Sequence, residues 1–157
     1  MDFNRIYKKY KDAVYNYVFW RVYSEEDAID ITQEVFVKVF KGLANFKGKS
    51  SLKTWIFAIA HNTTINYLSR KKYREEDIEN YFLSEEPLKN IRTKTMVLKA
   101  IEKLTDEHRE VIKLYYFDGF SYKEIANLLN ISIGTVKSRL NRAKEHLKEE
   151  LEGIYGK

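Results

Sequence analysis

Hydrogen-bonding and cationic side chains follow one another at helical spacing near the C-terminal end of this 157-residue chain. They are Thr135, Lys137, Ser138, Arg139, Asn141 and Arg142. Hydroxyl, amide and guanidinium groups of this kind hydrogen-bond to base edges and phosphates in the major groove of DNA. A charge-rich helix face taken alone is more often simply solvated. DNA binding is therefore the chemistry that these residues offer if the flanking elements hold the helix as a reading head.

The flanking elements have the pattern of a helix-turn-helix. Ser121 and Glu124 predict a capping box at the start of a short amphipathic helix. Asn130 stands where the chain must turn sharply, because asparagine tolerates the left-handed backbone conformation better than any residue except glycine. Ser132 is placed to cap the next helix. The predicted buried stripe of that helix is Ile133, Val136, Leu140, Ala143 and Leu147. The unit from Ser121 to Lys148 is thus predicted to read duplex DNA.

The charge distribution also favours a polyanionic partner. Lys and Arg number 28 against 23 Asp and Glu, a net charge of +5, and the pI is about 9.2. No acidic residue occurs in 35–74 or 131–144, whereas acids gather in 24–34 and 75–86. The charged N-terminal segment fits neither a signal peptide nor a membrane span, so a cytoplasmic location without membrane insertion is expected.

Independent catalysis is not expected. Cysteine is absent, which excludes disulfides, thiolate zinc sites and cysteine nucleophiles. His61, His108 and His146 are isolated in the sequence, and no HExxH motif, glycine-rich phosphate loop or nucleophile elbow occurs. We therefore predict no metal site, no cofactor and no enzymatic activity.

Helical periodicity runs through nearly the whole chain, which contains one proline, Pro87. The predicted buried stripe of the first helix is Ile6, Tyr10, Ala13, Val14, Tyr17 and Val18. The second helix starts at a capping box of Ser24 and Asp27 and stops at Gly42. Its buried residues are predicted to be Ala28, Ile31, Val35, Phe36, Val39 and Phe40. The third opens near Ser51 and is predicted to bury Trp55, Ile56, Ile59, Ala60, Thr63 and Leu68.

We predict an all-α fold of two small helical domains. Residues 1–74 form an N-terminal bundle of three or four helices, residues 75–92 an acidic linker, and residues 93–157 a four-helix domain with the helix-turn-helix. The helices before the helix-turn-helix are predicted to bury Met96, Val97, Ala100, Ile101, Leu104, Val111, Ile112, Leu114 and Tyr115. No regulatory domain is expected after Lys157.

Three segments, in order, make the chain resemble the extracytoplasmic-function group of bacterial sigma factors in the sigma-70 family. They are EEDAIDITQEVFVKVFK (25–41), FKGKSSLKTWIFAIAHNTTINYLSRKK (46–72) and the stretch 100–147 that contains the helix-turn-helix. Three matching segments are more specific than a helix-turn-helix alone, and they span nearly the whole chain. The resemblance implies a protein that binds core RNA polymerase and directs promoter-specific initiation by reading −35 duplex and melted −10 DNA.

The resemblance also implies roles for particular residues. Positions that match the surface for the polymerase β′ clamp helices are Asp27, Asp30, Gln33 and Glu34. Positions that match the −10 pocket and its cationic surroundings are Phe46, Lys47, Lys49, Lys53, His61, Asn62, Arg70 and Lys71. Single-stranded DNA is held by cationic grooves with pockets for splayed bases. The polar face of 135–142 is implied to contact the −35 duplex.

Some assignments in the −10 region stay open. Phe46 is equally suited to packing under its loop and to lining a base pocket, whereas Trp55 is expected to be core. His61 stands where many relatives have a basic residue, and Ala58 replaces a frequent arginine or lysine. At these two positions the chain departs from the basic residues that the family uses for phosphate contacts.

The implied partners are core RNA polymerase, through its β′ clamp helices and β flap, promoter DNA, and an anti-sigma protein. The alternative function is a stand-alone helix-turn-helix regulator whose N-terminal half is a dimerisation or ligand domain. The two differ in one property: the regulator binds duplex DNA tightly without polymerase.

Overall fold

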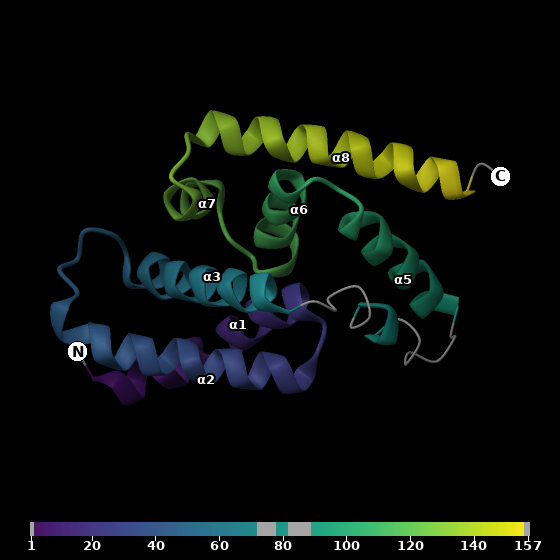
Figure 1. Ribbon diagram of the computed structural model, residues 1–157. Helices are drawn as coiled ribbons and strands as arrows, with labels where there is room; N and C mark the ends of the chain where they lie inside the picture. Colours follow the sequence, from purple (N-terminus) through teal and green to yellow (C-terminus); the bar gives the residue numbers. More distant parts are fainter. Residues whose placement is uncertain (1, 72–77, 82–88, 156–157) are drawn as a thin grey trace. The chain divides into compact units, whose positions relative to one another are not determined.

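The computed structural model describes residues 2–71, 78–81 and 89–155 of the chain. The chain divides into two compact units, Met1–Tyr81 and Phe82–Lys157. Every regular element in the described ranges is a helix, which confirms the predicted all-α fold (Figure 1).

The described part of the first unit is built on three long, mutually packed helices. These are α1 (Phe3–Val22), α2 (Glu25–Gly42), which continues into the short turn η1 (Leu43–Asn45), and α3 (Leu52–Arg70). Figure 1 shows α2 and α3 side by side. Each helix begins at a polar cap, because the side chains of Asp2, Ser24 and Ser51 accept hydrogen bonds from backbone N–H groups in the first turn. Ser24 accepts from Asp27 N at 3.3 Å.

The core of the first unit is one apolar stripe from each helix. Its buried members include Val14, Tyr17, Val18, Ala28, Ile31, Val35, Val39, Ile56, Phe57 and Ala60. The ring of Phe57 meets the ring of Tyr17 edge-on, with centroids 5.5 Å apart. Phe57 is fully buried although its position was not predicted. The reason is that α3 carries apolar residues on several sides near its start, so periodicity alone does not identify the inward face.

Two residues predicted as core in the first unit are wrong, because Ala13 is exposed and Phe40 is 64% exposed. Four others predicted as core are only half-buried, namely Tyr10, Trp55, Ile59 and Leu68. In α2 the inward face centres on Ile31 and Val35, so Phe40 falls on its edge, where its ring meets that of Phe3 at 5.2 Å. Side chains at the edge of a helical stripe follow the shape of the neighbouring helix rather than the periodicity.

Residues 78–81 form a helical segment whose last residue contacts α1. The ring of Tyr81 lies 5.7 Å from that of Phe19 and 5.3 Å from that of Tyr23. Residues 75–77 and 82–88 of the predicted linker lie outside the described residues. Helix α5 (Lys89–Glu102) begins within the last residues of the predicted linker. The bounds that we predict for the two domains and the linker therefore stay a prediction.

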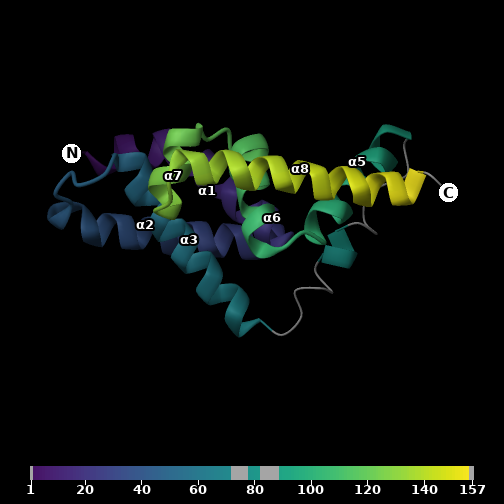
Figure 2. The ribbon, with the colours of Figure 1, turned by 90° about the horizontal axis from the view of Figure 1, so that it is seen from above.

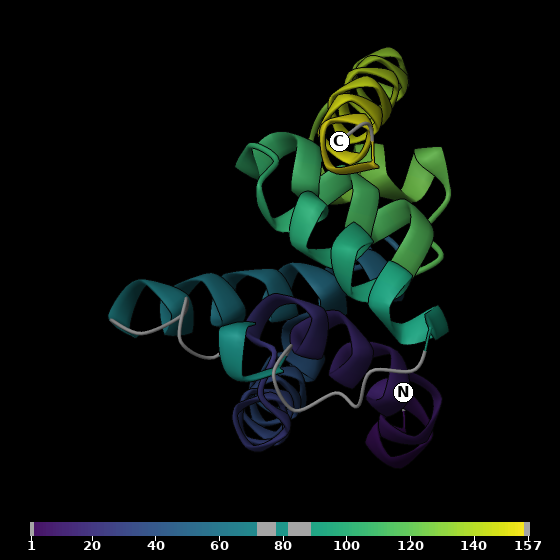
Figure 3. The ribbon, with the colours of Figure 1, turned by 90° about the vertical axis from the view of Figure 1, so that its right-hand side faces the viewer.

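The second unit builds the helix-turn-helix on two preceding helices. It consists of α5, α6 (Asp106–Ile112), the π-helical turn η2 (Lys113–Phe117), α7 (Tyr122–Leu129) and α8 (Ile133–Tyr155). Seen from above, α8 is one long continuous helix (Figure 2). The view along α8 shows α5 and α6 on the same side of this helix (Figure 3). α8 packs on α5, α6 and α7, which fixes its inward face.

The turn between α7 and α8 has the predicted geometry. Ser121 and Glu124 form a capping box, and Asn130 is left-handed with φ 55° and ψ 50°. The hydroxyl of Ser132 accepts from Thr135 N at 3.0 Å and caps α8. The predicted burial is confirmed for Val136, Leu140 and Ala143. The prediction for Ile133 is wrong, because this first residue of α8 is 43% exposed.

Phe57 and Phe40 provide a paired test of this core. Phe57→Ala should lower the free energy of unfolding by about 3 to 5 kcal/mol, since it empties a fully enclosed site. Phe40→Ala should cost about 1 kcal/mol or less, because the ring is mainly solvated. Urea titration followed by tryptophan fluorescence measures both, since Trp20 and Trp55 lie in the first unit. Equal losses would contradict the assignment.

Candidate nucleic-acid interface

The outer face of α8 presents polar side chains from its first three turns. Lys137, Ser138, Asn141 and Arg142 are exposed, on the side away from buried Val136, Leu140 and Ala143. Because the buried stripe is anchored on three other helices, the exposed groups are held on a rigid element. This arrangement suits insertion of α8 into a major groove.

Two of the predicted DNA-contacting residues on α8 already have protein partners. The hydroxyl of Thr135 lies 2.9 Å from that of Ser132 within the helix cap. Arg139 is 25% exposed and its guanidinium lies 3.6 Å from the carboxylate of Glu107 on α6. Arg139 therefore leans towards α6, so the free polar face is narrower on that side than the sequence predicts.

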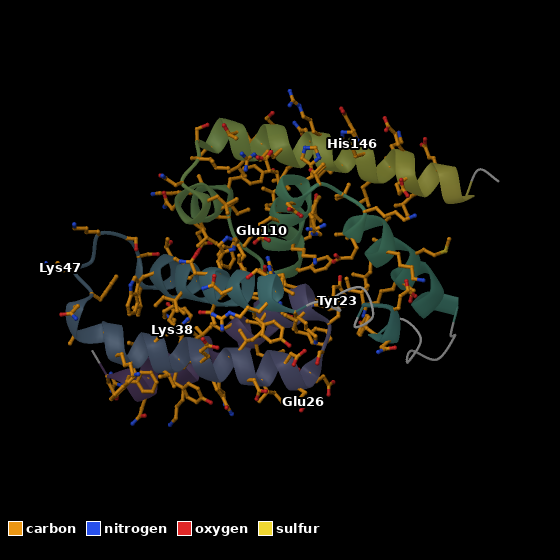
Figure 4. All side chains as sticks on the ribbon, in the orientation of Figure 1. Tyr23, Glu26, Lys38, Lys47, Glu110 and His146 are labelled. Carbon is orange, nitrogen blue, oxygen red and sulfur yellow. The ribbon has the colours of Figure 1, made fainter. Side chains whose placement is uncertain are left out.

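In the first unit, the loop before α3 is built around an aromatic pair. The rings of Phe46 and Trp55 lie 4.9 Å apart, and both side chains are half-buried. A Cβ atom at Gly42 would stand 3.0 Å from the Trp55 ring, so glycine permits this close packing. Phe46 thus packs under its loop. Lys47 and Lys49 are exposed on it, and Lys47 extends away from the helices (Figure 4).

Asn62 and His61 point in different directions from α3. Asn62 is exposed, on the side of α3 opposite buried Phe57 and Thr64. His61 is half-buried, and its Nδ1 lies 2.9 Å from the hydroxyl of Tyr17 on α1. Asn62 is therefore available to a nucleic acid, whereas His61 joins α3 to α1.

An ion pair joins a residue predicted to bind polymerase to one predicted to bind DNA. Lys71 Nζ lies 2.6 Å from Asp27 Oδ2, and these side chains are 25% and 21% exposed. Burial raises the pKa of Asp27, but hydrogen bonds from Lys71 and Tyr67 outweigh it, so this pKa lies below its ordinary value. The pair fastens the end of α3 to the start of α2.

The other residues predicted to bind polymerase lie on the outer face of α2. Asp30, Gln33 and Glu34 are exposed, and Glu34 pairs with Lys38 at 3.3 Å. The ammonium of Lys38 also donates to the Thr63 hydroxyl at 3.1 Å and so bridges α2 and α3 (Figure 4). Asp27 thus belongs to the seam between α2 and α3, apart from these exposed residues.

An apolar groove that sequence reasoning missed adjoins Gln33. It has a volume of about 570 Å³ and is lined by Phe3, Asn4, Tyr7, Gln33, Phe36, Val37 and Phe40. Tyr7, Val37 and Phe40 are 42%, 51% and 64% exposed. The signal was present in the sequence, since Gln33, Val37 and Phe40 recur at helical spacing, but Phe40 was placed in the core. Exposed apolar patches of this kind mark surfaces that bind other molecules.

The structure brings together two histidines that are isolated in the sequence. The rings of His108 on α6 and His146 on α8 lie 5.3 Å apart, and burial and the neighbouring His146 lower the pKa of His108. Figure 4 labels His146 on α8. Among the described residues, no group of three or more His, Asp or Glu side chains is placed to hold a metal ion. Within the same residues, no helix is long and apolar enough to cross a membrane.

Comparison with known proteins relates both units to one family. Residues 6–74 match the model of sigma-70 region 2, and residues 94–147 match the model of sigma-70 region 4. The chain is 36% identical over 155 residues to RNA polymerase sigma factor YlaC of Bacillus subtilis, covering 93% of this chain and 90% of that protein. It is 32% identical over 174 residues to the ECF RNA polymerase sigma-E factor of Escherichia coli K12, covering 97% of this chain and 87% of that protein.

Solved structures show the same fold. The sigma factor RpoE in complex with the anti-sigma factor NepR from Bartonella quintana matches with a TM-score of 0.69 at 25% identity, over 96% of this chain and 97% of that one. CnrH in complex with the cytosolic domain of CnrY matches with a TM-score of 0.72 at 25% identity, over 96% and 88%.

The fold and the exposed face of α8 define a helix-turn-helix protein of two helical units. Together with the matches over both units, they place it more narrowly. The chain belongs to the sigma-70 family of RNA polymerase sigma factors, in the extracytoplasmic-function group.

The Asp27–Lys71 pair makes a pH-dependent contribution to stability. Because the pKa of Asp27 is lowered in the folded chain, the pair stabilises above the unfolded value of about 3.9 and is lost as pH falls through the folded value. Asp27→Asn should therefore cost about 1 kcal/mol at pH 7 and progressively less below pH 4, as measured by urea titration at several pH values.

Glu34→Gln is the matched control, since it breaks the exposed pair with Lys38 on the same helix. It should change stability by about 0.5 kcal/mol or less. An Asp27→Asn loss that stays constant from pH 7 down to pH 2, below the lowered pKa of Asp27, would contradict the role of the ion pair.

Proposed function

We propose that this chain joins bacterial core RNA polymerase and directs it to promoters, with α8 reading the −35 duplex and α3 with its preceding loop holding melted −10 DNA. The chemistry of RNA synthesis belongs to the polymerase, and the chain itself is not an enzyme. Its place of action is the cytoplasm, where the polymerase and promoter DNA are.

The observation that carries the −35 half is the rigid polar face of α8. Lys137, Ser138, Asn141 and Arg142 are exposed together on a helix whose opposite side is buried. No acidic residue occurs between Ile131 and Lys144, so the first turns of this face carry only positive charge. Phosphate contacts by such cations position a helix, and bidentate groups read base edges.

The −10 half rests on exposed groups in the middle of α3 and on the loop before it. Asn62 is an exposed amide with donors and an acceptor, and Lys47 and Lys49 stand on the adjoining loop. A base flipped from the melted strand needs such a hydrogen-bonding partner, and the strand needs cations along its backbone. Neither of these two interactions requires nucleotide hydrolysis. Binding of the displaced strand would therefore itself favour opening of the promoter duplex.

The polymerase-binding surface is the outer face of α2. Asp30, Gln33 and Glu34 offer carboxylate and amide groups, and the groove beside Gln33 offers apolar area. A polar rim beside exposed aromatic side chains is the composition of protein interfaces. The matched structures include the sigma factor RpoE in complex with the anti-sigma factor NepR, and CnrH in complex with the cytosolic domain of CnrY. We expect a protein of the anti-sigma class to hold this chain inactive.

Run-off transcription tests the proposal against the stand-alone regulator. Purified bacterial core enzyme is supplied with a genomic fragment library, with and without this chain. Specific start sites that depend wholly on the chain are expected. Absence of specific starts on every template, together with tight duplex binding by the chain alone, would establish the regulator instead.

Arg142 tests the −35 half. Arg142→Ala should weaken binding to the −35 duplex by about 1 to 3 kcal/mol if the guanidinium reads a base. Fluorescence anisotropy with promoter and shuffled duplexes measures the loss. Lys148→Ala is the control: it removes one charge from the same helix, where the ammonium faces Glu152 at 3.9 Å, and should have a smaller effect. Unchanged affinity of the Arg142 variant for every duplex would remove Arg142 from the interface.

Asn62 tests the −10 half. Asn62→Ala should reduce open-complex formation, seen as permanganate-reactive thymines, while −35 duplex binding is kept, because only the amide contact to the displaced base is lost. Asn66→Ala makes the same change one helical turn further along and should leave opening near the wild-type level. A fall in thermal stability without any change in opening would make Asn62 structural.

A further inference from the structure

One lysine outside the predicted interface is held in place by a tyrosine. Lys144 is exposed on α8, and its ammonium lies 5.6 Å from the ring centroid of Tyr116. A hydrogen bond with the Tyr116 hydroxyl raises the pKa of Lys144 and holds the ammonium beside the ring. Tyr116 itself is 53% exposed, although tyrosine normally buries much of its ring.

The position of Tyr116 depends on the π-helical turn η2. Its wider backbone closure is shown by the hydrogen bond from Asp118 N to Lys113 O at 2.9 Å. The ring of Tyr115 lies 4.9 Å from that of Tyr116 and 5.1 Å from that of Tyr122, the first residue of α7. The three tyrosines thus form a connected row from η2 to the start of α7, with Lys144 at the Tyr116 end.

The two flanks of α8 differ in how their cations are used. On one flank, the guanidinium of Arg139 lies 3.6 Å from the carboxylate of Glu107, whose negative charge offsets part of its own. On the other flank, Lys144 lies over a neutral phenol and keeps its full charge. Lys144 follows Lys137 by seven residues, so the two ammonium groups lie on the same side of the helix, two turns apart.

We infer that Lys144 and Tyr116 form a phosphate-binding contact that holds the DNA backbone beside α8, opposite the flank of Arg139. A cation held by a phenol is preorganised, so less side-chain entropy is lost when it meets a phosphate. The phenol hydroxyl supplies a second donor to the same anion. The contact positions α8 without reading sequence, and the inference rests on the proposed reading of duplex DNA by this helix.

Salt dependence tests the contact in the full-length chain, alone and assembled with core polymerase. The probes are a duplex from a start region found by run-off transcription and a shuffled duplex of equal composition. Lys144→Gln should reduce the slope of log affinity against log salt by about 0.9, the loss of one neutralised phosphate. The loss of affinity relative to wild type should be equal on both duplexes, and it should shrink about 3.5-fold between 50 and 200 mM salt.

Matched variants separate the contact from general charge and from folding. Lys148→Gln makes the same change one turn further along α8 and should leave the slope closer to wild type. Tyr116→Phe keeps the ring and removes the hydroxyl, so it should weaken binding to both duplexes with a smaller change in slope. A duplex in which one backbone phosphate is replaced by a neutral methylphosphonate should bind wild type more weakly, but not Lys144→Gln.

Three results would overturn the contact: an unchanged salt slope for Lys144→Gln, a loss confined to the promoter duplex, or a loss explained entirely by lower thermal stability. Failure of the proposed function looks different. In that case core polymerase with this chain gives no specific starts, whereas the slope and methylphosphonate results still stand on duplexes of arbitrary sequence. If no duplex binds under either condition, both proposals fall.

Discussion

Burial of one side of α8 determines what the other side can do. Val136, Leu140 and Ala143 are enclosed by helices α5, α6 and α7, so the helix has no freedom to rotate about its axis. The left-handed backbone of Asn130 then sets the angle at which α8 leaves α7. Polar groups on the outer face are therefore presented in a fixed order, which base reading requires.

The first unit applies the same constraint to a different task. Phe57 and Ile56 hold the inner side of α3, and Asn62 consequently faces outward. The hydrogen bond between His61 and Tyr17 and the Asp27–Lys71 pair fasten α3 to both neighbouring helices. Single-stranded DNA is flexible. A rigid protein surface therefore supplies most of the fixed geometry that is needed to select one displaced base.

Sequence patterns predicted what depends on local chemistry. The helix caps at Ser51, Ser121 and Ser132 follow from side chains that accept hydrogen bonds from nearby backbone N–H groups. The turn at Asn130 follows from the tolerance of asparagine for the left-handed conformation. The partners chosen by tertiary packing were not predictable. The π-helical turn that exposes Tyr116 has no periodicity of its own, and the meeting of His108 with His146 joins separate helices.

Burial at the edges of helices was likewise beyond the sequence. Lys113 is only 1% exposed, and its burial is tolerated because the ammonium pairs with the carboxylate of Glu102 on another helix.

Footprinting of the assembled holoenzyme on a run-off start region tests most directly whether one chain reads two DNA elements for a polymerase. We predict an upstream protected duplex and, separately, permanganate-reactive thymines near the start, both dependent on this chain. A single protected duplex, formed equally without polymerase and never opened, would contradict the account.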